Sequence, residues 1–164
     1  ILANRLADGM ERAWEGSKKV RISGNEVDWE TIGVTLPVAD NLEEIEVQMK
    51  EPDLPFNYLS NNMGKLAWYK RQLEGKKTDI SCLSIGDVRL LLMPGELFVE
   101  YQLAAKAMRP DLFVAMAAYG DYGPFYIGTE EAYKQGGYEI ATSPVTGEAE
   151  KVLMEGIARL LRAE

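Results

Sequence analysis

The sequence predicts an α/β fold with a mixed, largely parallel sheet flanked by helices, preceded by an N-terminal helix and short strands. Two observations support this prediction. Apolar residues repeat at helical spacing in some segments and at every second position in others. Between Val88 and Tyr126 the pattern runs strand, helix, strand, which is the crossover unit of a parallel sheet.

The composition is that of an ordinary globular protein. The chain has 164 residues, 46% of them hydrophobic and 27% charged, so we expect residues 1–164 to form a single unit with one core. The 26 acidic and 18 basic residues give a net charge of -8, which opposes binding to nucleic acid. The longest apolar stretch, Leu112 to Tyr119, is well short of the roughly 20 residues of a membrane-spanning helix.

Cysteine and histidine usage narrows the chemistry that this chain can perform. Cys82 is the single cysteine, so no internal disulfide forms. Cysteine usage therefore does not distinguish an oxidising from a reducing compartment for this protein. The chain contains no histidine, which is the commonest general base and metal ligand. Any metal chemistry must therefore use carboxylates, tyrosines or groups outside this chain.

The first third of the chain is predicted to hold one helix followed by short strands. Apolar residues from Leu2 to Trp14 have helical spacing, and Gly16 is suited to end that helix. Alternation from Val20 to Val38, and again from Ile45 to Met49, predicts three or four short strands. A helix from Leu42 to Lys50 is the alternative, because its glutamates are good helix formers.

The remainder of the chain alternates helices and strands. Apolar spacing predicts a helix from Leu59 to Leu73, followed by a hairpin with Gly86-Asp87 as its two-residue turn. Pro94-Gly95 ends the second arm of the hairpin. The segments that follow are predicted as helix, strand, loop, short helix and final helix, over 97–108, 112–118, 119–127, 129–134 and from about 146 onward.

The carboxyl ends of the two strands in the crossover unit are the place to look for a site, because ligands bind there in such sheets. Glu96 directly follows Pro94-Gly95, and the loop Gly120 to Tyr126 follows the next strand. Taken alone, Glu96 is more simply a helix-start glutamate that stabilises the helix dipole by about 0.3–1 kcal/mol.

Tyrosines are concentrated in the same region. Five of the eight tyrosines fall within twenty positions, namely Tyr119, Tyr122, Tyr126, Tyr133 and Tyr138. A packed aromatic loop with hydrogen-bonded hydroxyls is the simpler interpretation of this cluster, and a binding site is the alternative. Asp121 lies in the same loop.

Two motifs in this region resemble the closing motifs of the neutral/alkaline (non-lysosomal) ceramidase family. The first is Met93-Pro94-Gly95-Glu96, and the second is Tyr126-Ile127-Gly128-Thr129-Glu130-Glu131-Ala132-Tyr133, followed by Tyr138-Glu139. Both stand in the family's order, and the resemblance is firm from Ile85 to Glu139, which is about a third of the chain.

This resemblance implies a zinc-dependent amidohydrolase that cleaves the N-acyl amide bond of a ceramide-like lipid with a zinc-activated water. Glu96 and Tyr126 match two zinc ligands of the family. Tyr138 matches the tyrosine that hydrogen-bonds the oxygen of the scissile carbonyl. Asp121, Tyr122 and Tyr133 are expected beside the metal or the substrate.

The same resemblance implies that this chain holds half of a zinc site. The family's other two zinc ligands are histidines that come earlier, and this chain has none. We therefore expect them in an upstream segment of the same polypeptide or on a separate piece. The chain would then be the C-terminal portion of a larger catalytic domain and inactive in isolation, which agrees with a helical pattern that starts at Ile1 without a cap.

The substrate is less firmly predicted than the metal. After Gly95-Glu96 the sequence Leu97-Phe98-Val99 replaces the family's phenylalanine and threonine pair, so the groove can differ. Two alternatives stay open: a non-catalytic scaffold or binding relative, and a zinc hydrolase of another amide or ester. Upstream histidines would favour an enzyme. The resemblance also favours a secreted or extracytoplasmic protein with an N-acyl lipid substrate and peripheral membrane contact.

Overall fold

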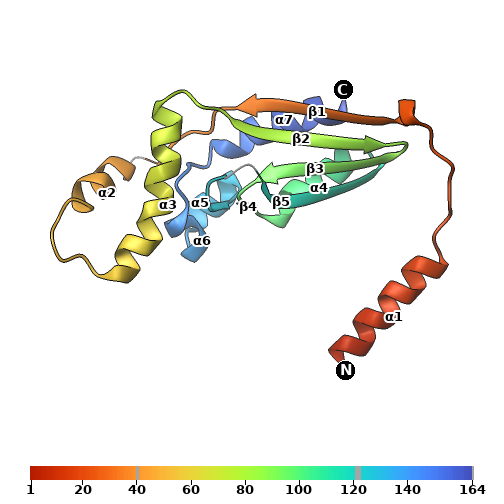
Figure 1. Ribbon diagram of the computed structural model, residues 1–164, viewed down its shortest axis with the longest axis horizontal. Helices are drawn as coiled ribbons and strands as arrows, with labels where there is room; N and C mark the ends of the chain where they lie inside the picture. Colours follow the sequence, from red (N-terminus) through yellow and green to blue (C-terminus); the bar gives the residue numbers. More distant parts are fainter. Residues whose placement is uncertain (40, 121–122, 164) are drawn as a thin grey trace.

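The computed structural model of the chain has an α/β fold, as predicted, and describes residues 1–39, 41–120 and 123–163 (Figure 1). Its strands are β1 (Val27–Val34), β2 (Thr78–Ile85), β3 (Val88–Pro94), β4 (Glu96–Leu97), β5 (Phe113–Gly120) and β6 (Tyr126–Ile127). Four of them form a sheet in the order β1-β2-β3-β5. The short strands β4 and β6 form a separate pair at the end of β3 and β5.

Seven α-helices and one short 3-10 helix are found in the described part of the chain. The helices are α1 (Leu2–Glu15), η1 (Gly24–Glu26), α2 (Leu42–Gln48), α3 (Phe56–Leu73), α4 (Val99–Met108), α5 (Glu130–Gln135), α6 (Tyr138–Thr142) and α7 (Ala149–Leu161). None of the described helices is long and apolar enough to cross a lipid bilayer.

The prediction of a largely parallel sheet is wrong in its detail. β1 pairs with β2, and β2 with β3, in the antiparallel sense, whereas β3 pairs with β5 in the parallel sense. The predicted hairpin turn at Gly86-Asp87 is confirmed, and a two-residue connection imposes antiparallel pairing. The predicted crossover through α4 is also confirmed and supplies the parallel pair.

Residues 20–49 contain less strand than predicted. Val20 and Ile22 lie in exposed chain without regular structure, and β1 begins only at Val27. The alternative helix is confirmed as α2. Its apolar residues mark one buried side of a helix, since Leu42 is buried and Ile45, one turn later, packs against the core.

Short elements account for the other differences. The predicted loop 119–127 is shorter, because β5 continues to Gly120 and Tyr126–Ile127 forms β6. The helix α6 was not predicted, since five residues carry no periodicity. Thr129 caps α5, because its hydroxyl accepts a hydrogen bond from the backbone N–H of Ala132 at 3.2 Å.

The core lies between one face of the sheet and the helices α4 and α7. In Figure 1 both helices lie behind the strands. Ile80, Cys82 and Leu91 point toward these helices and are at most 1% exposed. The packing is close, because a β-carbon on Gly156 of α7 would lie 2.5 Å from the Cδ1 atom of Ile80. Burial of these side chains is the main contribution to holding the layers together.

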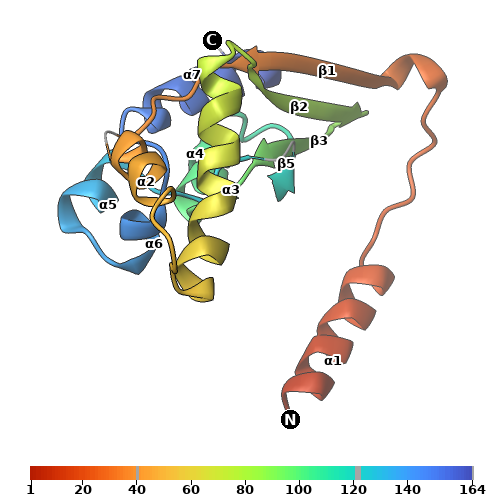
Figure 2. The same cartoon turned by 60° about the vertical axis from the view of Figure 1, so that its left-hand side comes forward.

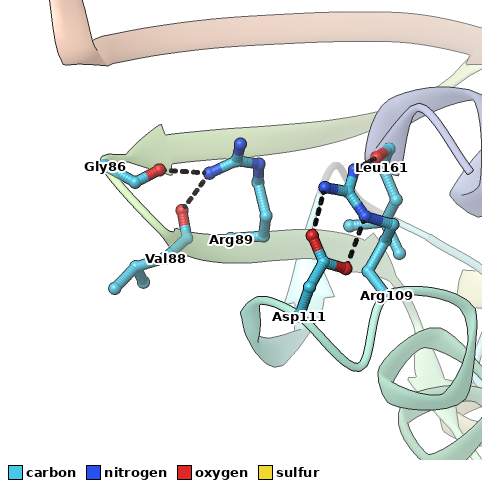
Figure 3. A network of polar contacts seen from close by, with 6 residues as sticks. All are labelled: Gly86, Val88, Arg89, Arg109, Asp111 and Leu161. Carbon is cyan, nitrogen blue, oxygen red and sulfur yellow. Dashed lines mark hydrogen bonds and ion pairs between the residues drawn. The ribbon is translucent and has the colours of Figure 1, made fainter.

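Arg109 joins the end of α4 to the end of α7 (Figure 3). Its Nε and Nη2 atoms donate to the two carboxylate oxygens of Asp111 at 2.9 and 2.8 Å, and its Nη1 donates to the carbonyl of Leu161 at 2.6 Å. On β3, Arg89 donates to the carbonyl of Gly86 at 2.6 Å, and this hydrogen bond stabilises the hairpin turn. These contacts fix the helix layer and the hairpin at the same end of the sheet.

Candidate functional site

Glu96 and Tyr126 lie side by side in the small parallel pair formed by β4 and β6. They are register partners, and Leu97 and Ile127 are the next pair along. The backbone N–H of Glu96 donates to the carbonyl of Phe125 at 2.7 Å. The two residues that the sequence singled out as oxygen donors are therefore brought together at the carboxyl ends of β3 and β5.

Two glycines allow this close approach. Gly95 has a φ of +64°, and a β-carbon there would lie 1.9 Å from the carbonyl oxygen of Pro124. On the facing segment, a β-carbon on Gly123 would lie 2.3 Å from the backbone nitrogen of Gly95. Side chains at these positions would push the segments apart and separate Glu96 from Tyr126.

Tyr119, at the end of β5, also contacts this site. Its backbone N–H donates to the carbonyl of Gly95 at 2.6 Å, and its φ of +65° is unusual for a residue with a side chain. Partial loss of solvent and a hydrogen bond between the phenol and the Glu96 carboxylate raise the pKa of Tyr119. Residues held in strained backbone conformations are often found at functional sites.

The charge of Glu96 dominates the electrostatics around Tyr126. It raises the pKa of the Tyr126 phenol, and partial burial and the neighbouring Tyr138 add to the effect. The rings of Tyr126 and Tyr138 meet edge to face, with centroids 6.0 Å apart and an interplanar angle of 71°. A phenol this close to a carboxylate stays protonated at neutral pH unless a cation is placed between them.

Tyr133 is connected to the backbone of Tyr126 by hydrogen bonds through Ser143. The hydroxyls of Tyr133 and Ser143 are 2.7 Å apart, and the Ser143 hydroxyl donates to the backbone carbonyl of Tyr126 at 2.7 Å. Tyr133 is partly buried, and its contact through Ser143 reaches the backbone of Tyr126. This contact gives Tyr133 a supporting position behind the backbone of Tyr126.

An open pocket extends from the pair. Its lining includes Glu96, Tyr126, Phe98 and Val99, together with the acidic residues Glu100 and Glu139. Tyr138 stands beside it at the start of α6 and is 69% exposed, so its phenol is free to reach a bound molecule. The lining of the pocket therefore contains both apolar side chains and carboxyl groups.

The structure brings together Glu96, Tyr126, Tyr138 and, in a supporting position, Tyr133. The other two predicted site residues, Asp121 and Tyr122, lie outside the described residues. Glu139 stands in the second motif of the sequence, where no role was given to it, and no pattern in the sequence pointed to Ser143. Tyr119 was seen as part of the tyrosine cluster, but its contact with Glu96 depends on the backbone turn.

The described residues fit part of a metal site. Glu96 and Tyr126 are two oxygen donors on one edge, and zinc accepts such ligands. In the part of the chain that the structure describes, no group of three or more histidines, cysteines, aspartates or glutamates lies close enough to hold a metal ion. A zinc ion held by these residues would need further ligands from elsewhere.

Two solved structures are similar to this chain. One is a neutral ceramidase from Pseudomonas aeruginosa, with a TM-score of 0.57 and 17% identity over 92% of this chain. The other is described as a ceramidase complexed with C2, with a TM-score of 0.47 and 19% identity over 52% of this chain. This chain spans 30% and 14% of the two proteins, respectively.

No protein-family model matches the chain, and no curated protein matches it. The likeness to the Pseudomonas aeruginosa protein therefore shows that the fold is ceramidase-like, and at this identity it shows the fold alone.

Proposed function

We propose that this chain is the C-terminal portion of a zinc-dependent amidohydrolase that cleaves the N-acyl amide bond of a ceramide-like lipid. The register pairing of Glu96 with Tyr126 carries the proposal, because it joins two motifs that are 30 positions apart in the sequence. The similarity of fold to a neutral ceramidase supports it.

In this proposal Glu96 and Tyr126 are two of the zinc ligands. Glu96 would offer carboxylate oxygens to the metal, and a cation bound beside the Tyr126 phenol would favour loss of the phenol proton. A bound zinc ion would supply a water of lowered pKa and polarise the amide carbonyl. The backbone contact between Gly95 and Gly123 keeps the two donors in register in advance.

Tyr138 has the catalytic role among the described residues. Its phenol is exposed, and its ring lies against that of Tyr126, so it can donate a hydrogen bond to the carbonyl oxygen of a substrate held at this edge. Negative charge develops on that oxygen as water adds to the carbonyl carbon, and a fixed donor stabilises it. Breakage of the C–N bond then gives an amine and a fatty acid.

The proposal requires a polypeptide segment that supplies the remaining ligands. With two oxygen donors, the chain by itself would bind zinc weakly and would not turn over substrate. We place this segment upstream in the same polypeptide or on a separate piece. A lipid substrate also implies contact with a membrane surface, and we propose a secreted or extracytoplasmic location.

The test is zinc content and N-acyl sphingosine hydrolysis, measured on the natural polypeptide that carries this chain. Glu96→Gln and Tyr126→Phe should each lower zinc occupancy and reduce hydrolysis at least about 100-fold, whereas Tyr138→Phe should reduce hydrolysis about 100-fold with zinc retained. Glu51→Gln, at an exposed position outside the pocket, and Tyr58→Phe, on α3, are the matched controls.

Unchanged zinc content and activity in both ligand variants would refute the proposal. A wild-type polypeptide that is folded, free of zinc and inactive would favour a non-catalytic scaffold. Zinc that depends on Glu96 and Tyr126, without activity on N-acyl sphingosine, would favour a hydrolase of another amide or ester.

A further inference from the structure

Tyr119 stands at the candidate site in a backbone conformation that a tyrosine rarely adopts. Its φ is +65°, in the left-handed region, where the β-carbon of an L-residue crowds the backbone. In the described part of the chain, the other residues with a side chain and a positive φ are Asp53 and Arg162. A short polar residue such as aspartate is tolerated in this region, whereas a bulky aromatic residue there is an outlier.

Packing of the ring does not explain why a tyrosine occupies this position. Tyr119 is 73% exposed, so its ring buries little apolar surface. The helix α1 does not cover it, since both views of the molecule show α1 standing apart from this end of the sheet and from α5 and α6 (Figures 1 and 2). The group that distinguishes Tyr119 from other residues is therefore its hydroxyl.

The backbone of Tyr119 does not require a tyrosine either. Its N–H donates a hydrogen bond to the carbonyl of Gly95 at 2.6 Å. A glycine at position 119 has the same N–H group and adopts a positive φ without strain. The turn at the end of β5 would therefore form with less strain if this residue had no side chain.

The hydroxyl of Tyr119 contacts the Glu96 carboxylate, to which it donates a hydrogen bond. Partial loss of solvent and this hydrogen bond raise the pKa of Tyr119, so the phenol is protonated at neutral pH and is the donor. Glu96 acts on the other phenol beside it, that of Tyr126, chiefly through its charge. The two tyrosines next to Glu96 therefore differ in how they interact with it.

A hydrogen bond from Tyr119 limits the positions that the Glu96 carboxylate can take. The backbone of Glu96 is already held, because its N–H donates to the carbonyl of Phe125 at 2.7 Å. Rotation of the long, half-buried side chain is the freedom that remains. Carboxylates that bind metals are usually oriented by hydrogen bonds from residues that do not touch the ion themselves. Tyr119 is placed to orient Glu96 in this way.

We propose that Tyr119 is a positioning residue, whose hydroxyl holds the Glu96 carboxylate beside Tyr126 and does not itself bind the metal. A carboxylate that accepts one hydrogen bond retains acceptor capacity on its other oxygen for a cation. The strained backbone of Tyr119 follows from this role, because the residue that turns the chain without strain, glycine, carries no hydroxyl. The effect on the metal rests on the proposed function, whereas the orientation of Glu96 does not.

The first test does not depend on zinc. Crystal structures of the metal-free natural polypeptide and of its Tyr119→Phe variant are compared. The Glu96 carboxylate should contact the Tyr119 hydroxyl in the wild type, and should take a different position, or several, in the variant. The backbone and the ring at position 119 should stay in place. A Glu96 carboxylate that is unchanged in Tyr119→Phe would overturn the proposal.

The second test compares zinc affinity, measured by competition with a chromogenic chelator, with the urea midpoint of the same polypeptide. Tyr119→Phe should weaken zinc binding about 10-fold and leave the midpoint unchanged. Tyr119→Gly should weaken zinc binding at least about 10-fold without lowering the midpoint, because it removes the strain. Asp53→Gly, at a φ of +63° between α2 and α3, is the matched control and should leave zinc affinity unchanged.

The outcomes separate this role from the proposed function. If Glu96→Gln lowers zinc affinity and Tyr119→Phe does not, the role of Tyr119 is refuted and the proposed function stands. If the wild type binds no zinc, or Glu96→Gln binds it equally well, the proposed function fails and the crystal structures alone decide the role of Tyr119.

Two further results would overturn the proposal. A urea midpoint that falls together with zinc affinity in both Tyr119 variants would show a general structural role. Loss of the tyrosinate formed on zinc binding in Tyr119→Phe, at saturating zinc, would make Tyr119 a metal ligand.

Discussion

Gly95 and Pro124 approach each other so closely that a β-carbon on Gly95 would lie 1.9 Å from the carbonyl oxygen of Pro124. This contact brings the segment after β3 against the segment before β6 and sets the register of Glu96 with Tyr126. The geometry of the candidate site therefore depends on backbone positions that carry no functional group.

Gly95→Ala should destabilise the chain more than another substitution at a glycine of positive φ. Gly75 has a φ of +73°, and a β-carbon there would meet nothing within 4 Å, so Gly75→Ala should cost about 1–2 kcal/mol from backbone strain alone. Gly95→Ala adds a steric clash and should cost about 3 kcal/mol or more. Urea unfolding of both variants measures the difference, and equal losses would contradict the role given to the contact.

Ser143→Ala should lower the stability of the chain by removing a hydrogen bond to the backbone of Tyr126. Ser143 joins the Tyr133 hydroxyl to the carbonyl of Tyr126, and its loss leaves that carbonyl without the donor, at a cost of about 1–3 kcal/mol. Thr142→Ala is the neighbouring control, because the Thr142 hydroxyl bonds within α6 to the carbonyl of Tyr138. Thermal unfolding compares the two, and a larger loss in the control would contradict the assignment.

Tyr101 should make stability sensitive to alkaline pH. It is fully buried, its hydroxyl donates to the carbonyl of Gly128 at 2.9 Å, and burial raises its pKa far above the ordinary value. The unfolded chain ionises this phenol above about pH 10, so its contribution is complete below that pH and is lost as the pH rises further. Tyr101→Phe should lower stability at pH 7 by about 1–3 kcal/mol and flatten the alkaline loss.

Tyr138→Phe is the control for this pH dependence, because Tyr138 is 69% exposed. Denaturant unfolding at intervals from pH 7 to 11 gives both curves. The interpretation of Tyr101 is wrong if its variant retains the wild-type alkaline slope.

Lys65 should be a destabilising residue of α3. It is 9% exposed, and burial lowers its pKa. Because this pKa is lower in the folded chain than in the unfolded chain, the charged Lys65 side chain destabilises the fold at neutral pH. This loss of stability is relieved as the pH rises toward the ordinary pKa of lysine. Lys65→Met should therefore stabilise the chain by about 1 kcal/mol at pH 7, measured by urea unfolding. Lys50→Met, at an exposed position, should have no such effect.

Periodicity predicted the long elements of the fold well. The apolar stripes of α3 and α7, the hairpin of β2 and β3 and the crossover through α4 follow from local spacing. The largely antiparallel pairing of the sheet was missed because β1 joins it from a distant part of the sequence. Val27 pairs with Ile85, and no local pattern encodes that partner. In α2, seven residues were too few to separate helical from alternating spacing.

The candidate site was predicted in part for a similar reason. Glu96 and Tyr126 follow strand ends, so a rule about strand edges placed them together. Tyr119 and Ser143 contact these residues only because the backbone turns at Gly95 and at the end of α6. Such contacts depend on tertiary geometry, which the spacing of residues does not reveal.

The central claim is that Glu96 and Tyr126 bind zinc together. Its most direct test is to add zinc to the natural polypeptide and to monitor tyrosinate formation by ultraviolet absorbance. We predict one tyrosinate per bound zinc at neutral pH, a signal absent from Tyr126→Phe and Glu96→Gln but retained in Tyr138→Phe. A tyrosinate signal that persists in Tyr126→Phe, or full zinc binding without any tyrosinate, would contradict the claim.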